Sequence, residues 1–341
     1  MPMRHEYDLT IEDGCVTNGC ALADDVSLEV FDEMQNFAVS LSTLWTTPGD
    51  MPVVKFDDEF KKWRQTQIDA CNEIRDNRLS CLLPWEILKA LPAERKASNS
   101  LYFSQGGLGS CMGHADSFAY HSALLHDIGR GASHIYDPFN PVVTWAITKG
   151  GSLRGGQSVS EMSKGANQLG HYTQQLVGAD NQRMPSNYKN YTEAAKKHQS
   201  GLVFLNFRGK ELADEIIQTC AAGFGIAIGN GTAVNGSTQD SNGVKIPTLR
   251  GSWAHATSFI GYRIVKRVEY VGWVNSHGGR YPSSDEGEPA DMCWMPRSIV
   301  ESFVATASGY GPPYAVFHKG EYGRDTSLMP MRVPYPANWR W

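Results

Sequence analysis

Apolar residues recur at helical spacing near the start of the chain. Within residues 27–45 they fall alternately four and three positions apart, which places them on one face of an amphipathic helix: Val30, Met34, Phe37, Leu41 and Leu44. Asp24 and Asp25 precede this stretch, where the helix dipole favours acidic side chains. The pattern therefore predicts a first helix over 27–45.

A second apolar stripe predicts a helix over 57–79, with Phe60, Trp63, Cys71 and Ile74 on one side. Pro84 and the later Leu91-Pro92-Ala93 interrupt the helical pattern, because proline removes a backbone donor and clashes with the preceding turn. Residues 1–95 are therefore predicted to form a helical N-terminal extension.

Beyond the extension, helical patterns give way to strand patterns near residue 200. Helices are predicted from Cys111 to about Ile128 and over 157–169, which Gly170 follows. Further helices are predicted over 210–221 and 297–305. Strands rich in apolar residues are predicted over 201–207, 224–228, 253–264, 268–275 and 313–318. Helices before residue 200 and strands after it indicate an α+β fold.

Composition narrows the function classes. A chain of 341 residues, 41% hydrophobic and 20% charged, suits one large or two medium globular domains. A net charge of −5 argues against a general nucleic-acid or anionic-membrane partner. No apolar run reaches the roughly 18 residues of a membrane span, and the first residues lack the apolar stretch of a secretory signal. These features predict a cytoplasmic or virion-associated location, with no nucleic acid and no membrane as partner.

The cysteines point to reduced thiols. There are seven, an odd number, and none forms a CxxC pair. This argues against a structural zinc site and excludes a complete disulfide framework. Mostly reduced thiols fit a cytosol-like compartment, and we expect neither a metal nor a cofactor.

A glycine-rich segment ends at a cysteine that begins a predicted helix, Ser104-Gln105-Gly106-Gly107-Leu108-Gly109-Ser110-Cys111. Unpaired N–H groups and the positive end of a helix dipole stabilise a thiolate, and they can lower a cysteine pKa from about 8.5 to roughly 3.5–7.5. The same N–H groups can hold an oxyanion, and the Gln105 side chain can add a donor. The segment is typical of a nucleophile, with a buried cysteine in a helix cap as the alternative.

Two strands further along the chain carry a histidine and an asparagine. His255 lies in Trp253-Ala254-His255-Ala256, at the mouth of an apolar strand, and Asn275 ends the next one. If the two strands pair as a hairpin that turns near Val265 and Lys266, residues whose numbers sum to about 530 lie opposite each other, as His255 and Asn275 do. Directly opposed side chains share a face of the sheet. Asn275 is then placed to hold the imidazole with one nitrogen toward a thiol.

These three segments together resemble the cysteine, histidine and asparagine blocks of the papain family of cysteine peptidases (clan CA, family C1), in that family's order. His255 lies 144 residues after Cys111, within the roughly 130–150 typical of the family. Arg154-Gly155-Gly156, followed by a helix ending at Gly170, resembles the Gly-Gly segment that family members lay along the substrate backbone. The resemblance covers about residues 95–320.

The resemblance implies a fold and its boundaries. A papain-like two-lobed peptidase domain would span residues 96–341. Its helical lobe would cover about 105–200 and an antiparallel, β-barrel-like lobe about 201–325.

The resemblance also implies a cysteine endopeptidase acting on polypeptides. Cys111 would attack the peptide carbonyl as a thiolate, His255 would protonate the leaving amine, and Asn275 would orient His255. Gln105 and the Cys111 N–H would hold the oxyanion. Gly155 and Gly156 would bind the substrate backbone. A substrate pocket would be lined by residues beside the histidine and by one strand: Trp253, Ala254 and Ala256, with 224–228.

Three positions depart from the family pattern. Met112 follows the nucleophile where the family usually has an aromatic residue, and Leu108 stands where a disulfide-forming cysteine is common. His277 replaces the tryptophan that shields the Asn–His hydrogen bond. These changes are closer to the disulfide-poor prokaryotic and viral members.

The sequence is also consistent with other functions. The chain is alternatively a papain-fold assembly subunit, for example of a virion, with little or no turnover. His126-Asp127 resembles the metal-binding block of HD-domain phosphohydrolases, but His114 and His121 lie too close upstream for companion ligands. Residues 1–95 are either an inhibitory prosegment or a segment that docks the domain onto a larger protein assembly. We expect them to pack away from the nucleophile.

Overall fold

One sheet of seven strands organises the part of the chain that the structure describes, in the order β1-β2-β7-β3-β4-β5-β6. The computed structural model describes residues 53–54, 56–76, 83–129, 135–180, 183–278 and 287–318. The strands are β1 (Val53–Val54), β2 (Ser200–Phe204), β3 (Gly225–Gln239), β4 (Lys245–Val265), β5 (Val268–Val274), β6 (Met292–Pro296) and β7 (Tyr314–His318). Only β1 and β2 pair in parallel; the other neighbours in the sheet are antiparallel.

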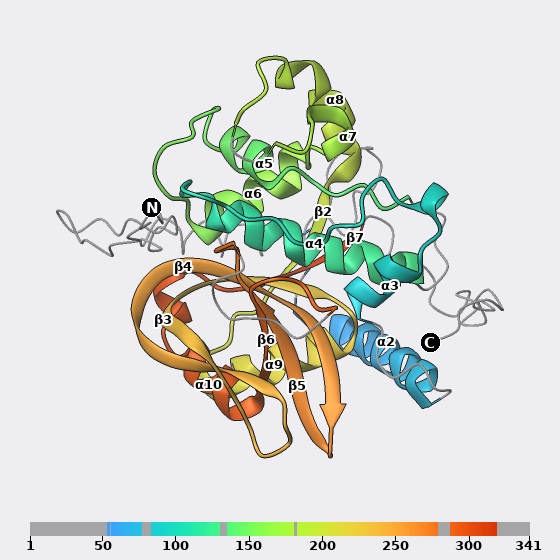
Figure 1. The fold of residues 1–341 in the computed structure, drawn as a ribbon, viewed down its shortest axis with the longest axis vertical. Coiled ribbons are helices and arrows are strands. Elements are labelled where there is room, and N and C mark those ends of the chain that lie inside the picture. Colours follow the sequence, from blue (N-terminus) through green and yellow to red (C-terminus); the bar gives the residue numbers. More distant parts are fainter. Residues whose placement is uncertain are drawn as a thin grey trace, which may run out of the picture.

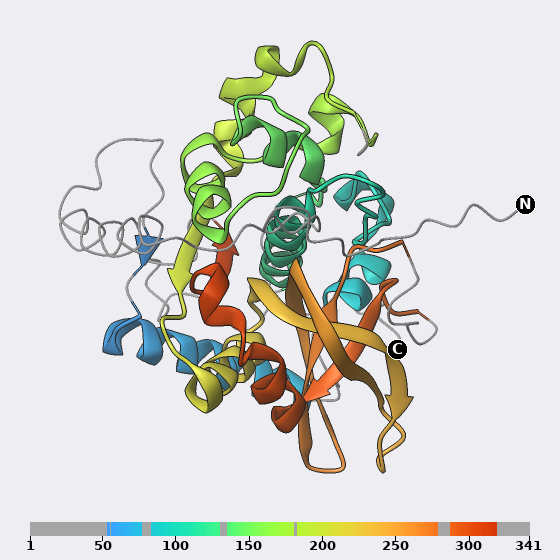
Figure 2. The same cartoon turned by 90° about the vertical axis from the view of Figure 1, so that its left-hand side faces the viewer.

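The helices divide into two groups on either side of a central one, α4 (Cys111–Gly129). Above it in Figure 1 lie α5 (Pro141–Ile147), α6 (Val159–Leu169), α7 (Gln174–Val177) and α8 (Thr192–Ala195). Below it, α9 (Gly209–Ala221) and α10 (Arg297–Val304) accompany the sheet, as Figure 2 shows from the side. Two further helices in the described part of the chain are α2 (Asp58–Asp76) and α3 (Pro84–Ala90).

This arrangement confirms the predicted α+β, two-lobed papain-like fold. The lobe expected to be barrel-like is an open sheet among the described residues, with β1 and β6 at its edges. No described helix is both long enough and apolar enough to span a bilayer.

Helix α4 is buried along its whole length because both lobes pack against it. It contacts α3, α5 and α6, and also β3, β4 and β7. Two glycines permit the closest approaches. A Cβ on Gly113 would lie 2.5 Å from the Pro141 carbonyl oxygen, and one on Gly225 would lie 2.4 Å from the backbone of Ala119. A helix buried all round is fixed in position, so its first residue, Cys111, is fixed as well.

The β4–β5 hairpin corrects the predicted register. Lys266 and Arg267 form a two-residue loop with φ of 47° and 68°, the left-handed conformation that a type I′ turn requires. Val265 therefore pairs with Val268, and past an irregularity near residue 260 the ladder places Ser258 opposite Val274. The expectation that His255 lies directly opposite Asn275 is wrong. By this register Asn275, one residue beyond β5, is level with Thr257, and His255 is its diagonal neighbour on the same face.

The described part of the N-terminal extension packs on both lobes at sites other than Cys111. In α2, Trp63 stacks on Phe224 at 5.1 Å between ring centroids, and Arg64 Nη1 donates to Glu215 Oε2 on α9 at 2.5 Å. Helix α3 packs on the far end of α4, where a Cβ on Gly129 would lie 3.0 Å from Ile87. The helix predicted over 27–45 lies outside the described residues.

Candidate active site

Cys111 is the first residue of α4, as predicted, and its side chain is completely buried. Burial raises the pKa of its thiol to about 12, because a thiolate loses its hydration there. Hydrogen bonds from the backbone of Ala256, Met112 and Cys111 itself oppose this rise. Backbone N–H donors favour the charged form of sulfur. These donors would therefore stabilise a Cys111 thiolate once water or substrate reaches the sulfur.

His255 lies on β4 and its imidazole is bonded to Asn275. The distance from His255 Nε2 to Asn275 Oδ1 is 2.6 Å, and both side chains are buried. The same Oδ1 accepts the Ser276 N–H at 2.8 Å, and the Asn275 N–H donates to the Asp291 carbonyl at 3.0 Å. An amide oxygen only accepts, so Nε2 carries the proton and Nδ1 is the basic nitrogen of the neutral ring.

The cysteine and histidine segments meet at Ala256. Ala256 follows His255 in β4, and its backbone bonds to the Cys111 thiol. A second contact joins the same elements, because Ser258 Oγ donates to the Ala115 carbonyl of α4. His114, also on α4, is close to His255, which lowers the pKa of His114 electrostatically. Burial is the larger cause of this shift, and the pKa of His114 falls to about 4.

Gln105 ties the glycine-rich turn to the segment that follows Asn275. Its backbone N–H donates to the Ser276 carbonyl at 2.9 Å, and its Oε1 accepts the Ser276 hydroxyl at 2.5 Å. Its Nε2 donates to the Leu108 carbonyl at 2.9 Å. A side-chain amide has two N–H donors, so one donor remains for another acceptor.

His277 packs on the His255 ring from the position where the papain family has tryptophan. The two ring centroids are 4.4 Å apart with planes tilted by 35°. Trp253 completes the group, at 4.7 Å from the His255 centroid and 5.7 Å from that of His277. Burial lowers the pKa of His277 to about 4, so this second imidazole is neutral at physiological pH.

The glycine pair proposed to bind the substrate backbone lies in the loop before α6. Gly155 is exposed and has a φ of 72°, and Lys149 Nζ donates to its carbonyl at 3.0 Å. Lys149 also lies 4.3 Å from the ring centroid of Trp145 on α5. Trp145 in turn touches the first turn of α4, since a Cβ on Gly113 would lie 2.6 Å from its Cβ. The loop is therefore linked to the start of α4 through α5, and Gly156 is half-buried beside it.

The residues predicted to line a substrate pocket fall into two sets. Trp253, Ala254 and Ala256 are buried beside His255 on β4. The segment 224–228 forms core instead, because β3 is a central strand covered on both faces. Phe224 stacks on Trp63, and Ile226 and Ile228 belong to the apolar cluster that includes α9.

His126 and Asp127 are buried at the end of α4. Among the described residues, no three His, Cys, Asp or Glu side chains gather in a way that could hold a metal ion. The absence of metal at His126 and Asp127 stays a prediction.

Comparison with known proteins finds similar structures. No protein-family model and no curated protein matches the sequence. The structure is similar to that of xylellain, a cysteine protease from Xylella fastidiosa, with a TM-score of 0.43 and 16% identity over 68% of this chain and 88% of that one. It is also similar to procathepsin B S9 from Trypanosoma congolense, with a TM-score of 0.41 and 9% identity over 70% and 77% of the two chains.

A third similar structure is digestive procathepsin L 3 of the Tenebrio molitor larval midgut. Its TM-score is 0.42 and its identity 12%, over 85% of this chain and 98% of that one. TM-scores below 0.5 at such identities leave the activity of this chain to be inferred from its own residues.

Proposed function

We propose that this chain is a cysteine peptidase that hydrolyses peptide bonds through Cys111, His255 and Asn275. The observation that carries the proposal is the 2.6 Å bond between His255 Nε2 and Asn275 Oδ1, beside a cysteine that begins a buried helix. This bond fixes the imidazole tautomer and leaves Nδ1 as the base for the thiol. The Ala256 contact to the thiol supports the pairing of Cys111 with His255.

The chemistry then follows from these positions. His255 Nδ1 takes the Cys111 proton, and the thiolate attacks the peptide carbonyl to form a carbon–sulfur bond. The Cys111 N–H and the Gln105 amide hold the oxyanion that develops. The imidazolium of His255 gives its proton to the leaving amine, which departs and leaves an acyl-enzyme. Water attacks this acyl-enzyme with His255 again as base, which releases the carboxylic acid and restores the thiol.

The substrate contacts belong to the same proposal. The Gly155-Gly156 backbone would pair with an extended peptide, because glycine allows a second backbone to approach closely. Trp253, Ala254 and Ala256 would form the wall beside His255. The substrate is a polypeptide in extended conformation.

One observation favours a second candidate, a papain-fold assembly subunit with little turnover. Cys111, His255 and Asn275 are each 0% exposed. A thiol whose pKa burial raises to about 12 is protonated at neutral pH, so it reacts only after the site opens. A subunit that never opens would keep this arrangement for structure alone.

Covalent labelling of Cys111 separates the two candidates. The protein is incubated with a peptidyl epoxide and with iodoacetamide, and the modified residue is identified by mass spectrometry. A peptidase is labelled by the epoxide at Cys111, and the label disappears in Cys111→Ala but persists in Cys220→Ala. Cys220 is the matched control because it is also buried, on α9, where burial raises its pKa. Absence of epoxide labelling under native conditions, with full labelling after denaturation, would overturn the peptidase proposal.

Residues 1–95 are proposed to dock the domain onto a larger assembly, without inhibiting it. A truncation tests whether the extension inhibits the site. It removes residues 1–52 and keeps α2 and α3, because Trp63 and Trp85 of these helices are buried in the core. We expect the rate of epoxide labelling at Cys111 to change less than threefold. A rise of tenfold or more for the bulky epoxide alone, equivalent to about 1.4 kcal/mol, would identify an inhibitory prosegment instead.

A further inference from the structure

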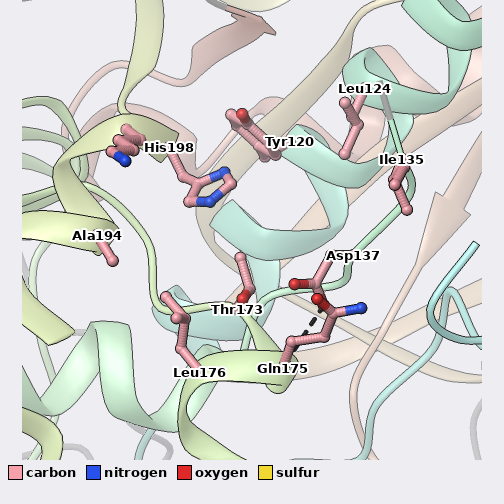
Figure 3. A pocket seen from close by; sticks show the side chains of 10 residues that line it. Tyr120, Leu124, Ile135, Asp137, Thr173, Gln175, Leu176, Ala194 and His198 are labelled. Atoms are coloured by element: carbon pink, nitrogen blue, oxygen red, sulfur yellow. Dashed lines mark hydrogen bonds between the residues drawn. The ribbon is translucent and has the colours of Figure 1, made fainter. Parts of the chain in front are cut away.

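A pocket opens in the helical lobe, away from Cys111. Its volume is about 390 Å³, within the roughly 300–1,000 Å³ typical of small-molecule sites. It is bounded by α4, α7, α8 and the segment before α5, and Figure 3 shows the side chains that surround it. Tyr120 lies nine residues after Cys111 on α4, which is about 14 Å at a rise of roughly 1.5 Å per residue.

An acidic group stands on one wall. Asp137 accepts hydrogen bonds from the Thr173 side chain and from the Gln175 N–H, the latter at 3.4 Å. A carboxylate offers about four acceptor positions, so these two leave acceptor capacity for a ligand. No cationic side chain among the described residues forms an ion pair with Asp137. Partial burial raises its pKa, because the carboxylate is removed from water without a counter-charge.

Basic groups stand on the other wall. Lys197 and His198 line the pocket from the segment that follows α8. Figure 3 shows His198 and Asp137 on opposite sides of the space. Within the described part of the chain, Lys197 pairs with no carboxylate. Among the described residues, neither Asp137 nor Lys197 forms an ion pair.

The space between these charges is apolar. Leu124, Leu176 and Ile135 line it. Ile135 is 55% exposed, the highest value among the large apolar side chains that the structure describes. An exposed apolar side chain beside unpaired charges is the combination that a small amphiphilic ligand would cover.

We propose that this pocket binds a small zwitterion with an apolar body, an amino acid or short peptide with free termini. Its ammonium group would pair with Asp137, its carboxylate with Lys197 and His198, and its side chain would pack between Leu124 and Leu176. A phosphate ligand is disfavoured because Asp137 would repel it. The proposal does not rest on peptidase activity, although a peptidase releases ligands of this class.

The first test varies the ligand and leaves the protein unchanged. The full chain with Cys111→Ala is titrated with L-leucine and with L-leucyl-L-leucine by calorimetry, so that no probe is hydrolysed. L-leucinamide lacks the carboxylate and N-acetyl-L-leucine lacks the ammonium group. Losing either charge is expected to raise Kd at least tenfold. Tighter binding of L-leucine would identify a free amino acid as the ligand, and tighter binding of L-leucyl-L-leucine would identify a short peptide.

The second test asks whether each charge meets its assigned partner. Asp137→Asn should raise the Kd of the zwitterion about tenfold but leave N-acetyl-L-leucine within twofold. Lys197→Met should weaken the zwitterion but leave L-leucinamide within twofold. The matched controls Asp69→Asn and Lys62→Met change exposed charges on α2 and should leave every Kd unchanged. Ala194→Phe should block binding by filling the pocket from α8.

Three outcomes overturn the proposal. One is the absence of saturable binding by both zwitterions. Another is equal affinity for the zwitterions and for the probes that lack one charge. The third is an equal rise of Kd in the pocket variants and in the α2 controls. The ligand series decides the matter even if Asp137→Asn weakens α7, because it requires no substitution in the pocket.

Discussion

Two buried histidines near α4, His255 and His171, have partners of similar chemical type but different geometry. His255 bonds to Asn275 beside Cys111. His171 contacts a serine and an acid, with Ser200 Oγ at 2.7 Å and Asp116 Oδ2 at 3.4 Å. From residue types alone, the second centre has the composition of a Ser-His-Asp triad. A triad also requires the nucleophile and the orienting group to meet opposite nitrogens of the ring, so that a proton leaves on one side while the other side is held.

The ring nitrogens tell the two centres apart. At His255 the orienting amide occupies Nε2, which leaves Nδ1 for the thiol. At His171 both Ser200 and Asp116 contact Nε2, and Nδ1 makes no hydrogen bond within the described part of the chain. His171 is also stacked on Phe139, with centroids 4.2 Å apart and planes 7° apart. We therefore interpret His171 as a structural histidine.

The largest effect should come from removing the two nucleophile candidates in turn. Cys111→Ala should lower kcat/KM on a peptide substrate by at least about 10³-fold, because the covalent route disappears. Ser200→Ala should leave kcat/KM within threefold and lower only stability. The measurement is hydrolysis of a fluorogenic peptide at matched concentrations of folded protein. A large loss of activity in Ser200→Ala with an unchanged melting temperature would mean that His171 belongs to the active centre.

The next effect concerns the orienting groups. Asn275→Ala should lower kcat by about 10²-fold, the lower end of what general acid–base catalysis contributes, because the His255 ring loses its fixed orientation. Tyr314→Phe removes the hydroxyl that donates to Asp116 Oδ1 at 2.7 Å. This change should leave kcat unchanged and cost about 1 kcal/mol of unfolding free energy. The comparison fails if the two variants lose activity equally.

The sequence predicts the helix and strands around Cys111 and His255 better than it predicts how the strands pair. The helix beginning at Cys111 is confirmed, because a glycine-rich turn before an apolar run leaves few alternatives. The hairpin is confirmed, yet its register is not, because the turn lies at Lys266 and Arg267 and not at Val265 and Lys266. The irregularity near residue 260 then shifts the pairing back by one residue, and no local signal in the sequence marks it. His255 and Asn275 share a face in either register, because a shift of two residues preserves the alternation.

Other differences have equally physical reasons. The sequence pattern marks Pro84 as a break in the helix, but Pro84 begins α3, where a missing N–H costs nothing at the first helical position. Strand β6 was not predicted because Met292–Pro296 is short and ends in proline, which an edge strand tolerates. The contact between His277 and His255 required the fold, although the unusual residue at position 277 was visible in the sequence.

The acid of the His171 centre should make stability depend on pH. Burial raises the pKa of Asp116 from 3.8 to about 7, while the Tyr314 hydroxyl opposes this rise. The pKa of His171 is lowered by burial, and further by His121 and His198. A raised carboxyl pKa means that the folded state keeps a proton that the unfolded state has lost. The stabilising contribution of Asp116 is therefore present in full below about pH 4 and is lost as pH rises through 7.

Asp116→Asn tests this linkage, because asparagine can still accept the Tyr314 hydroxyl and does not titrate. Relative to the parent, the variant should gain about 2–3 kcal/mol of unfolding free energy between pH 5 and pH 8. His171 titrates in both proteins, so its contribution largely cancels in the difference. Chemical denaturation at several pH values provides the measurement. A difference that stays constant with pH would show that Asp116 does not hold a proton in the folded state.

The smallest effect concerns His277 and separates the catalytic histidine from its neighbour. His255 must become an imidazolium to protonate the leaving amine, and a second positive ring 4.4 Å away would oppose that charge. Because burial lowers the pKa of His277 to about 4, this ring is neutral above about pH 5 and does not oppose a positive charge on His255. At pH 4 half of the His277 rings are protonated, so the parent should lose about twofold in kcat/KM relative to His277→Phe, which cannot titrate. His277→Gln, polar and uncharged, should behave as His277→Phe does in this ratio. If kcat/KM of the parent and of both variants falls in parallel from pH 6 to pH 4, His277 does not titrate beside His255, and its role is packing alone.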